Sequence, residues 1–182
     1  MLPVGPLMVE HRLIERVIAL WKAELESIRK TGRLNPGFID SAVDFMVTYA
    51  DRCHHGKEED ILFKRLKEKK LPAELKNILD ELIREHVVAR KTVAEISRLR
   101  QAYPAEDANA AKEVFLNIET IVGLYPPHIE KEDRRFFLPC MAYFDEREKQ
   151  AMLEEFREFD RLLIHEKYKS VVSIMEVCQK EG

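Results

Sequence analysis

Strong helix breakers fall at only four places in the 182-residue chain, and this spacing limits the fold more than any other feature. Asn35 before Pro36 suits a helix start, as does Pro72 after a lysine-rich stretch. Between the breakers, apolar residues recur at intervals of three and four, as in Leu75, Ile78 and Leu82, and no strand-like alternation appears. We therefore expect long helices over about residues 7–30, 36–69, 72–102 and 107–142.

Helices of this length, joined by short connections, predict an all-α fold with an up-down-up-down four-helix bundle over about residues 7–142. A C-terminal helical extension is expected over about 145–180. No Gly/Ser-rich linker divides the chain, so residues 1–182 are interpreted as a single domain. The Pro126-Pro127 pair lies inside the fourth helix and predicts a kink, a bulge or a break there.

Charge and cysteine usage exclude several classes of function. The net charge of −3 offers no basic surface for nucleic acid or an anionic membrane. No run approaches the ~20 apolar residues of a membrane span, and the start of the chain lacks the features of a signal peptide. A cytoplasmic protein is the resulting expectation. The three cysteines form no C-x-x-C pair, which predicts neither a disulfide framework nor a zinc–thiolate site.

One motif, H-x-x-K-E followed by Glu or Asp, occurs twice. The first copy starts at His54 and the second at His128, and an aromatic residue follows each at the same offset. On a helix, positions i and i+4 share a face, so each copy places an imidazole and a carboxylate, Glu58 or Glu132, in the same space. A single such pair in a charged helix usually marks a solvated face, but two aligned copies favour a shared role.

The turns allow the levels of these residues to be compared. In an antiparallel bundle, two residues equally far from the connecting turn lie at the same height, and a two-residue error moves a level by only about 3 Å. His11 and the first motif are equidistant from the first turn, the first motif and His86 from the second, and His86 and the second motif nearly so from the third. The residues expected to converge are His11, His54, Glu58, His86, His128 and Glu132.

Four imidazoles and two carboxylates brought together inside a bundle require a physical reason. Burying them unpaired would cost several kcal/mol for each ionised group, whereas a bound metal removes that cost. A mixed histidine and carboxylate set suits iron, manganese or zinc, and carboxylates from two helices can bridge two ions. The alternative is a set of surface histidines beside salt-bridged glutamates.

The pattern of one histidine, H-x-x-x-E, one histidine and H-x-x-x-E across four helices resembles the hemerythrin-like, or HHE cation-binding, family. The likeness runs from His11 to about Pro139 and includes Ile61-Leu62-Phe63 and Phe136-Phe137-Leu138-Pro139 after the two motifs. It implies two non-heme iron ions bridged by Glu58 and Glu132. It also implies a small-molecule ligand such as dioxygen, nitric oxide or peroxide, with manganese or zinc as alternative metals.

The chain departs from the family's pattern at one position. Classical hemerythrins have a second histidine one turn after the third-helix histidine, but here that position is Arg90. The residues that would replace it are His55, Glu59, Tyr49, Tyr125 or His165. His55 is about 100° around the helix from His54, so we expect it outside the ligand set or at the surface unless the helix is distorted. Glu59 is expected to support the ligands or face solvent, and His165 lies on the C-terminal extension.

Three functions are compatible with these residues. The favoured interpretation is a non-enzymatic metal protein that binds dioxygen or a related ligand, or senses iron or oxygen. The second is a di-iron peroxidase or oxidase, which a histidine-rich donor set disfavours because such enzymes use carboxylate-rich sites. The third is a metal-storage or structural bundle. The sequence does not indicate an oligomeric state.

Overall fold

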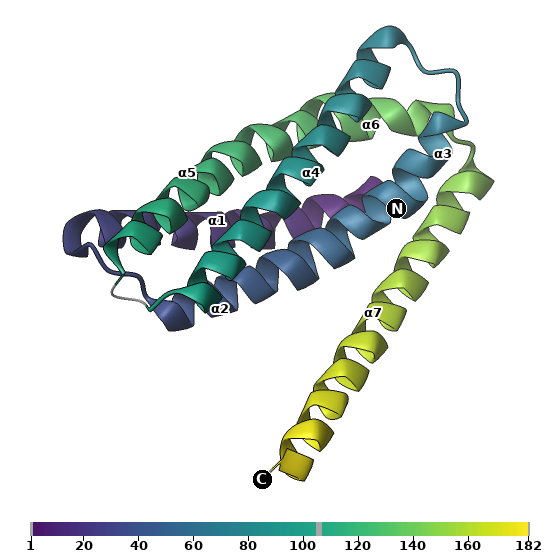
Figure 1. The fold of residues 1–182 in the computed structure, drawn as a ribbon. Helices are drawn as coiled ribbons and strands as arrows, with labels where there is room; N and C mark the ends of the chain where they lie inside the picture. The colour runs from purple at the N-terminus through teal and green to yellow at the C-terminus, as the bar shows by residue number, and fades with distance from the viewer. Residues whose placement is uncertain (1, 105–106, 182) are drawn as a thin grey trace.

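The computed structural model describes residues 2–104 and 107–181, with side chains as far as residue 163. This part of the chain is helical and contains no strand. Figure 1 shows four rods lying side by side and a further helix diverging from them. The elements are α1 (Val4–Thr31), α2 (Pro36–Phe45), η1 (Met46–His55), η2 (Glu58–Phe63), α3 (Lys64–Lys67), α4 (Ala73–Ala102), α5 (Ala108–Lys131), η3 (Glu132–Phe136), α6 (Phe137–Cys140), η4 (Met141–Tyr143) and α7 (Glu146–Glu181).

The four rods are α1, α2 through α3, α4, and α5 through α6, as the helical periodicity predicts. Their ends follow local chemistry. Gly32 ends α1 in the left-handed region at φ 67°, and its N–H donates to the carbonyl of Ile28. The side chain of Asn35 accepts from the N–H of Phe38 at the start of α2, and Asp107 caps α5 in the same way.

Three segments within the rods are π-helices rather than α-helices. These are η1 and η2 in the second rod and η3 in the fourth, and all of them carry the repeated histidine–glutamate motif. A π-helix has wider turns than an α-helix and changes the direction of the side chains it carries. The break considered at Pro126-Pro127 does not occur, since α5 continues through both prolines to Lys131. The bulge instead follows in η3.

The bundle contains two apolar cores, one toward each end. The first includes Ile14, Trp21, Met46, Ile96 and Ile118, and the second includes Leu7, Phe63, Leu82, Phe137 and Phe156. The histidines and glutamates of the repeated motif lie at the level where these two cores meet. The site is therefore held between well-packed apolar layers on both sides.

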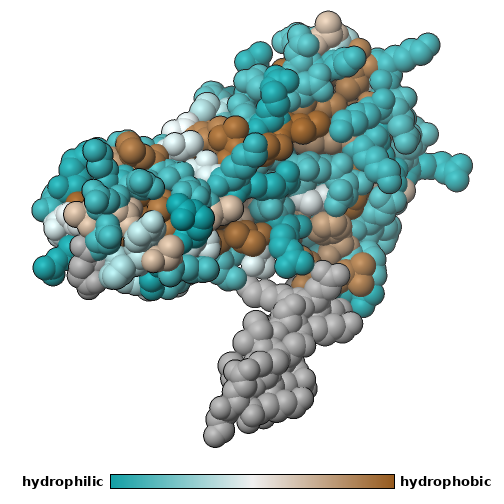
Figure 2. All heavy atoms as spheres, in the orientation of Figure 1, coloured by the Kyte–Doolittle hydropathy of each residue, from teal (hydrophilic) through white to brown (hydrophobic). Residues whose placement is uncertain are grey.

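The helix α7 corresponds to the expected C-terminal extension. Its first part packs against the second core through Met152 and Phe156. Figure 2 shows hydrophilic side chains over much of the visible face of the molecule, with apolar residues in narrow strips. Among the described residues, no helix combines the length and apolar character needed to cross a membrane.

Candidate metal centre

Seven buried side chains that can bind metals meet in the middle of the bundle. They include all six residues whose convergence the turn positions predict, and His55 as well. They divide into two groups in which the potential ligand atoms lie within 4.8 Å of one another. The first group is His11, His54, Glu58 and Glu132, and the second is His55, His86 and His128.

The two glutamates lie between the groups. Glu58 has one oxygen 3.4 Å from Nε2 of His54 and the other 3.4 Å from Nε2 of His86. Glu132 has Oε2 3.1 Å from Nε2 of His11 and 3.3 Å from Nε2 of His128. Each carboxylate therefore faces histidines of both groups, which is the arrangement required of a ligand that bridges two ions.

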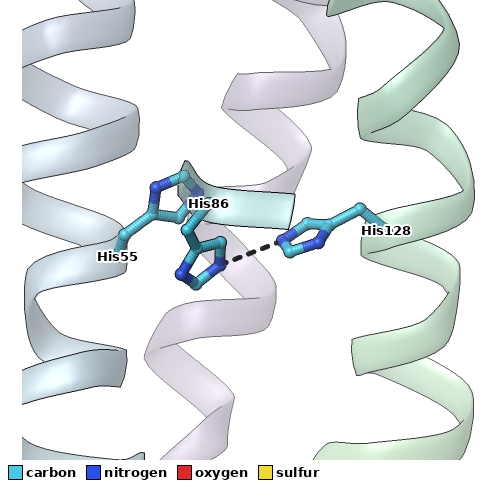
Figure 3. A group of neighbouring side chains, drawn as sticks. All are labelled: His55, His86 and His128. Atoms are coloured by element: carbon cyan, nitrogen blue, oxygen red, sulfur yellow. Dashed lines mark hydrogen bonds between the residues drawn. The ribbon is translucent and has the colours of Figure 1, made fainter. Parts of the chain in front are cut away.

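The second group brings together three histidines from three rods. Figure 3 shows His55 from η1, His86 from α4 and His128 from α5 pointing toward one another. The Nε2 atoms of His86 and His128 are 3.3 Å apart. The rings of His55 and His86 are stacked, with centroids 3.8 Å apart. Three imidazoles at such distances could hold a metal ion.

The position of His55 differs from the expectation that it lies outside the ligand set. Only 1% of its surface is exposed, the same as for its neighbour His54. Both side chains turn inward because η1 is a π-helix, in which the angle between successive residues is smaller than the 100° of an α-helix. His55 therefore lies with His86, on the side of the centre that lacks a histidine because Arg90 replaces the family's second third-helix histidine.

Six inner atoms, all of them in the first group, are left without hydrogen-bond partners. Nε2 of His11, Nε2 of His54 and both carboxylate oxygens of Glu58 and of Glu132 are buried and unpaired. Buried polar atoms are normally satisfied, and each one left unpaired costs about 1–3 kcal/mol. These atoms point at a shared space and are good ligands for iron, manganese or zinc. The residues present therefore fit a bound metal cation.

Burial and proximity shift the protonation equilibria of the inner groups. Burial lowers the pKa of His54 to about 4, and burial together with His86 lowers the pKa of His55 well below its ordinary value. Burial beside Glu132 raises the pKa of Glu58. Burial opposes ionisation of Glu132 too, but the surrounding imidazoles, His128 foremost, hold its pKa well below the ordinary value. Without metal, Glu58 therefore favours its protonated form and Glu132 its ionised form.

The pKa of His11 is shifted in the opposite direction to those of His54 and His55. Burial opposes the charged form of His11, but Asp133 and Glu132 outweigh it and raise the pKa of His11 to about 9. In the metal-free centre a protonated His11 therefore compensates part of the charge of Glu132. Binding a metal at Nε2 would replace that proton.

All five inner histidines use their outer nitrogen in the same way. Each Nδ1 lies within hydrogen-bond distance of a carboxylate, which fixes Nδ1 as a protonated nitrogen and turns Nε2 inward. In His11 the Nε2 lone pair becomes available once its proton is lost. The pairs are His11–Asp133 at 2.7 Å, His54–Glu10 at 2.9 Å, His55–Asp51 at 3.3 Å, His86–Glu59 at 2.6 Å and His128–Glu85 at 2.7 Å. This is the tautomer that a metal ligand requires.

These outer carboxylates are held by cations in turn. Arg12 binds Asp133, Lys57 binds Glu10, and Lys131 binds Glu85. Arg90 binds both Asp51 and Glu59, at 2.6 and 2.7 Å. Arg90 therefore has a role of its own at the position of the missing histidine, because it binds the two carboxylates that orient His55 and His86.

The carboxylates at Nδ1 and the cations bound to them account for the remaining positions of the repeated motif. In each copy, the lysine forms an ion pair with the carboxylate that is hydrogen-bonded to the motif's own histidine. The acidic residue after Glu58 or Glu132 reaches across to another rod, Glu59 to His86 and Asp133 to His11. Sequence reasoning did not identify Glu10 and Glu85, although a signal existed, since each directly precedes a ligand histidine in a Glu-His pair.

The remaining residues considered as replacements for the missing histidine have separate positions. Glu59 supports His86 as described. Tyr125 is buried, and its ring lies 6.3 Å from His55 and 6.2 Å from His128 between centroids. Tyr49 stacks on Phe45 outside the centre. The side chain of His165 lies outside the described residues.

Comparison with known proteins agrees with the geometry. The sequence model of the hemerythrin HHE cation-binding domain matches residues 2–138. The chain belongs to this family, a family of helical bundles that bind metal cations. No curated protein and no solved structure matches the chain significantly.

Proposed function

We propose that the protein holds two iron ions, one in each histidine group, bridged by Glu58 and Glu132. The proposed ligands of the first ion are His11 and His54, and those of the second are His55, His86 and His128. The observation that carries this proposal is the set of buried inner atoms without hydrogen-bond partners in the first group, beside a second group of three imidazoles whose ligand atoms lie within 4.8 Å of one another. Manganese or zinc in the same positions is the alternative that metal analysis decides.

The proposed activity is reversible binding of dioxygen or a related small ligand, such as nitric oxide or peroxide, or sensing of iron or oxygen through it. Bound iron would supply the redox-active, open coordination position that such ligands need. The first group offers fewer histidines than the second, so the ions would differ in their surroundings. Five imidazoles against two carboxylates favour ligand binding over the oxidative turnover of carboxylate-rich enzyme sites.

The surroundings of the centre support a small ligand. A cavity of about 80 Å³ lies between η1 and α4, and its lining includes His55, Tyr125, Ala89 and Val93. A space of this size accepts a diatomic molecule or peroxide. Arg90 also lines this cavity, with its guanidinium held by Asp51 and Glu59. The apolar cores on either side limit access of bulk water.

The test is metal analysis of protein loaded with ferrous iron without oxygen, followed by optical spectra before and after addition of dioxygen. About two irons per chain, with bands that appear on oxygenation and reverse on its removal, are expected. Nitric oxide should give a distinct spectrum of the ferrous protein. Continued consumption of peroxide with a reductant would instead establish the enzyme. One ion or none per chain would contradict the proposal.

A further inference from the structure

The helix α7 lies outside the part of the chain that the family model covers, yet it contacts the segment that carries the ligands. The family match ends at residue 138, and α7 begins at Glu146. Phe159 of α7 packs directly on Gly56, which lies between His55 and Glu58 in the sequence. A Cβ atom at Gly56 would lie 2.6 Å from the ring of Phe159. This close approach brings the next residue of α7, Asp160, to the edge of the metal centre.

Asp160 binds a buried lysine. The ammonium of Lys57 is 0% exposed, and it donates to Asp160 at 2.7 Å and also to Glu10. Cys53 adds its thiol, which donates to Asp160 at 3.3 Å. A buried ammonium is stable only when its charge is paired, and removing one partner leaves donors unsatisfied. The two carboxylates thus determine where Lys57 lies.

Glu10 connects this lysine to a metal ligand. One of its oxygens accepts from Lys57, and the other is 2.9 Å from Nδ1 of His54. A continuous chain of charged contacts therefore runs from Asp160 through Lys57 and Glu10 to His54. Its last link is the hydrogen bond that orients the imidazole.

The second copy of the motif shows what α7 adds. Lys131, the counterpart of Lys57, binds Glu85 and Glu81 at 2.6 Å each, both from α4. The bundle itself thus provides both partners of Lys131. For Lys57, among the described residues, the bundle provides one carboxylate, Glu10, and α7 provides the second. The two halves of the centre differ in their dependence on the C-terminal helix.

We propose that Asp160 is a positioning residue for the metal centre, which couples the docking of α7 to metal binding by the His11–His54 group through Lys57 and Glu10. The inference rests on the proposed metal binding at this group. Coupling of this kind is reciprocal, so metal binding at His54 stabilises the docked helix to the same extent that docking strengthens metal binding.

The test uses the full chain loaded with Co²⁺, whose release to excess EDTA is followed by its optical spectrum. Asp160→Asn and Asp160→Ala should accelerate release of one of the two ions by about tenfold, the usual effect of losing an outer-layer contact. Release of the other ion should not change, and Asp160→Glu should restore part of the slow phase. Lys131→Met should accelerate the opposite phase.

Matched controls separate positioning from general attachment of α7. Glu155 binds Arg65 and Glu148 binds Lys69, so both join α7 to the bundle away from the ligands. Glu155→Gln and Glu148→Gln should leave both release phases unchanged. Equal acceleration in these controls, acceleration of both ions in the Asp160 variants, or no acceleration at all would overturn the proposal.

A second readout reports on the hydrogen bond itself. In the Co²⁺ protein, the shifted Nδ1–H proton of His54 should exchange with water faster in Asp160→Asn, while that of His128 should not. Backbone amides of residues 150–163 should exchange more slowly in wild-type protein with Co²⁺ than without it. Two bound ions with no effect of Asp160 would refute the coupling alone, whereas a wild-type chain that binds no metal would refute the proposed function as well.

Discussion

The imidazole rings of His55 and His86 stack with centroids 3.8 Å apart and planes inclined by only 15°. Two charged imidazolium rings would repel strongly at this distance. Burial lowers the pKa of both residues, and the neighbouring His86 adds to the lowering at His55. The pair is therefore two neutral rings, with Nδ1 of each bound to a carboxylate and Nε2 left for a ligand.

Replacing His55 should cost the centre one of its two ions. His55→Ala removes one of three imidazoles in the second group and opens a space beside His86, so this group should lose its ion first. The measurement is the metal content per chain after dialysis against weak chelator. Leu116→Ala, at an exposed position of α5, is the comparison variant. Retention of both ions by His55→Ala would place His55 outside the ligand set.

Replacing a bridging glutamate should have a larger effect than replacing one histidine. Glu58→Ala or Glu132→Ala removes a ligand from both proposed ions at once, so most of the bound metal should be lost. Metal content and the optical spectrum of the iron-loaded chain measure this. Glu130→Ala is the matched control, since Glu130 belongs to the same motif as Glu132 and its side chain is exposed. Normal metal content in either bridge variant would contradict the shared role.

Arg90 should contribute to metal affinity without touching the metal. Arg90→Ala frees Asp51 and Glu59, which orient His55 and His86, and the affinity should fall by about 10- to 100-fold. Arg90→Lys should restore little, because one ammonium cannot reproduce the two-pronged contact of a guanidinium. Chelator competition gives the affinity. Arg98→Ala on the exposed face of α4 should have no effect, and an equal loss there would argue for a general charge effect.

Metal removal should destabilise the fold as well as empty the site. A ligand that binds the native state at 100 times its Kd adds about 2.7 kcal/mol of stability. For a chain of this size, each kcal/mol corresponds to roughly 2–4 °C in Tm. Thermal unfolding with and without excess chelator should therefore differ by several degrees. The variant lacking both bridges, Glu58→Ala with Glu132→Ala, should show no such difference.

Glycine is required at position 56 because of its contact with α7. Gly56→Ala places a methyl group against the ring of Phe159, and overpacking of this kind costs about 1–3 kcal/mol. Adding Phe159→Leu should recover part of the loss. Gly123→Ala is the matched control, since no atom lies within 4 Å of its added Cβ. Urea unfolding measures both. Gly123→Ala should be neutral or stabilising, because alanine favours a helix over glycine by up to about 1 kcal/mol, and equal destabilisation of the two variants would contradict a specific contact at Gly56.

Much of this architecture follows from local chemistry. The breakers around Asn35, Pro72 and Asp107 set the helix ends, because caps and prolines act within one turn of the chain. Equal distances from the turns place His11, His86 and the two motifs at one level, because every helical residue advances the chain by the same rise. The fold and the six converging residues could thus be predicted without coordinates.

Other features depend on contacts that no local pattern contains. His55 turns inward because η1 adopts the wider π geometry, whereas the α-helical period of the sequence directs it elsewhere. For all of the inner histidines except His55, the carboxylate that Nδ1 meets comes from a residue 27 to 122 positions away. Asp160 reaches Lys57 because Gly56 admits Phe159. Periodicity thus determined the helices and the level of the site, while the direction of each side chain and its partner were decided by packing between helices.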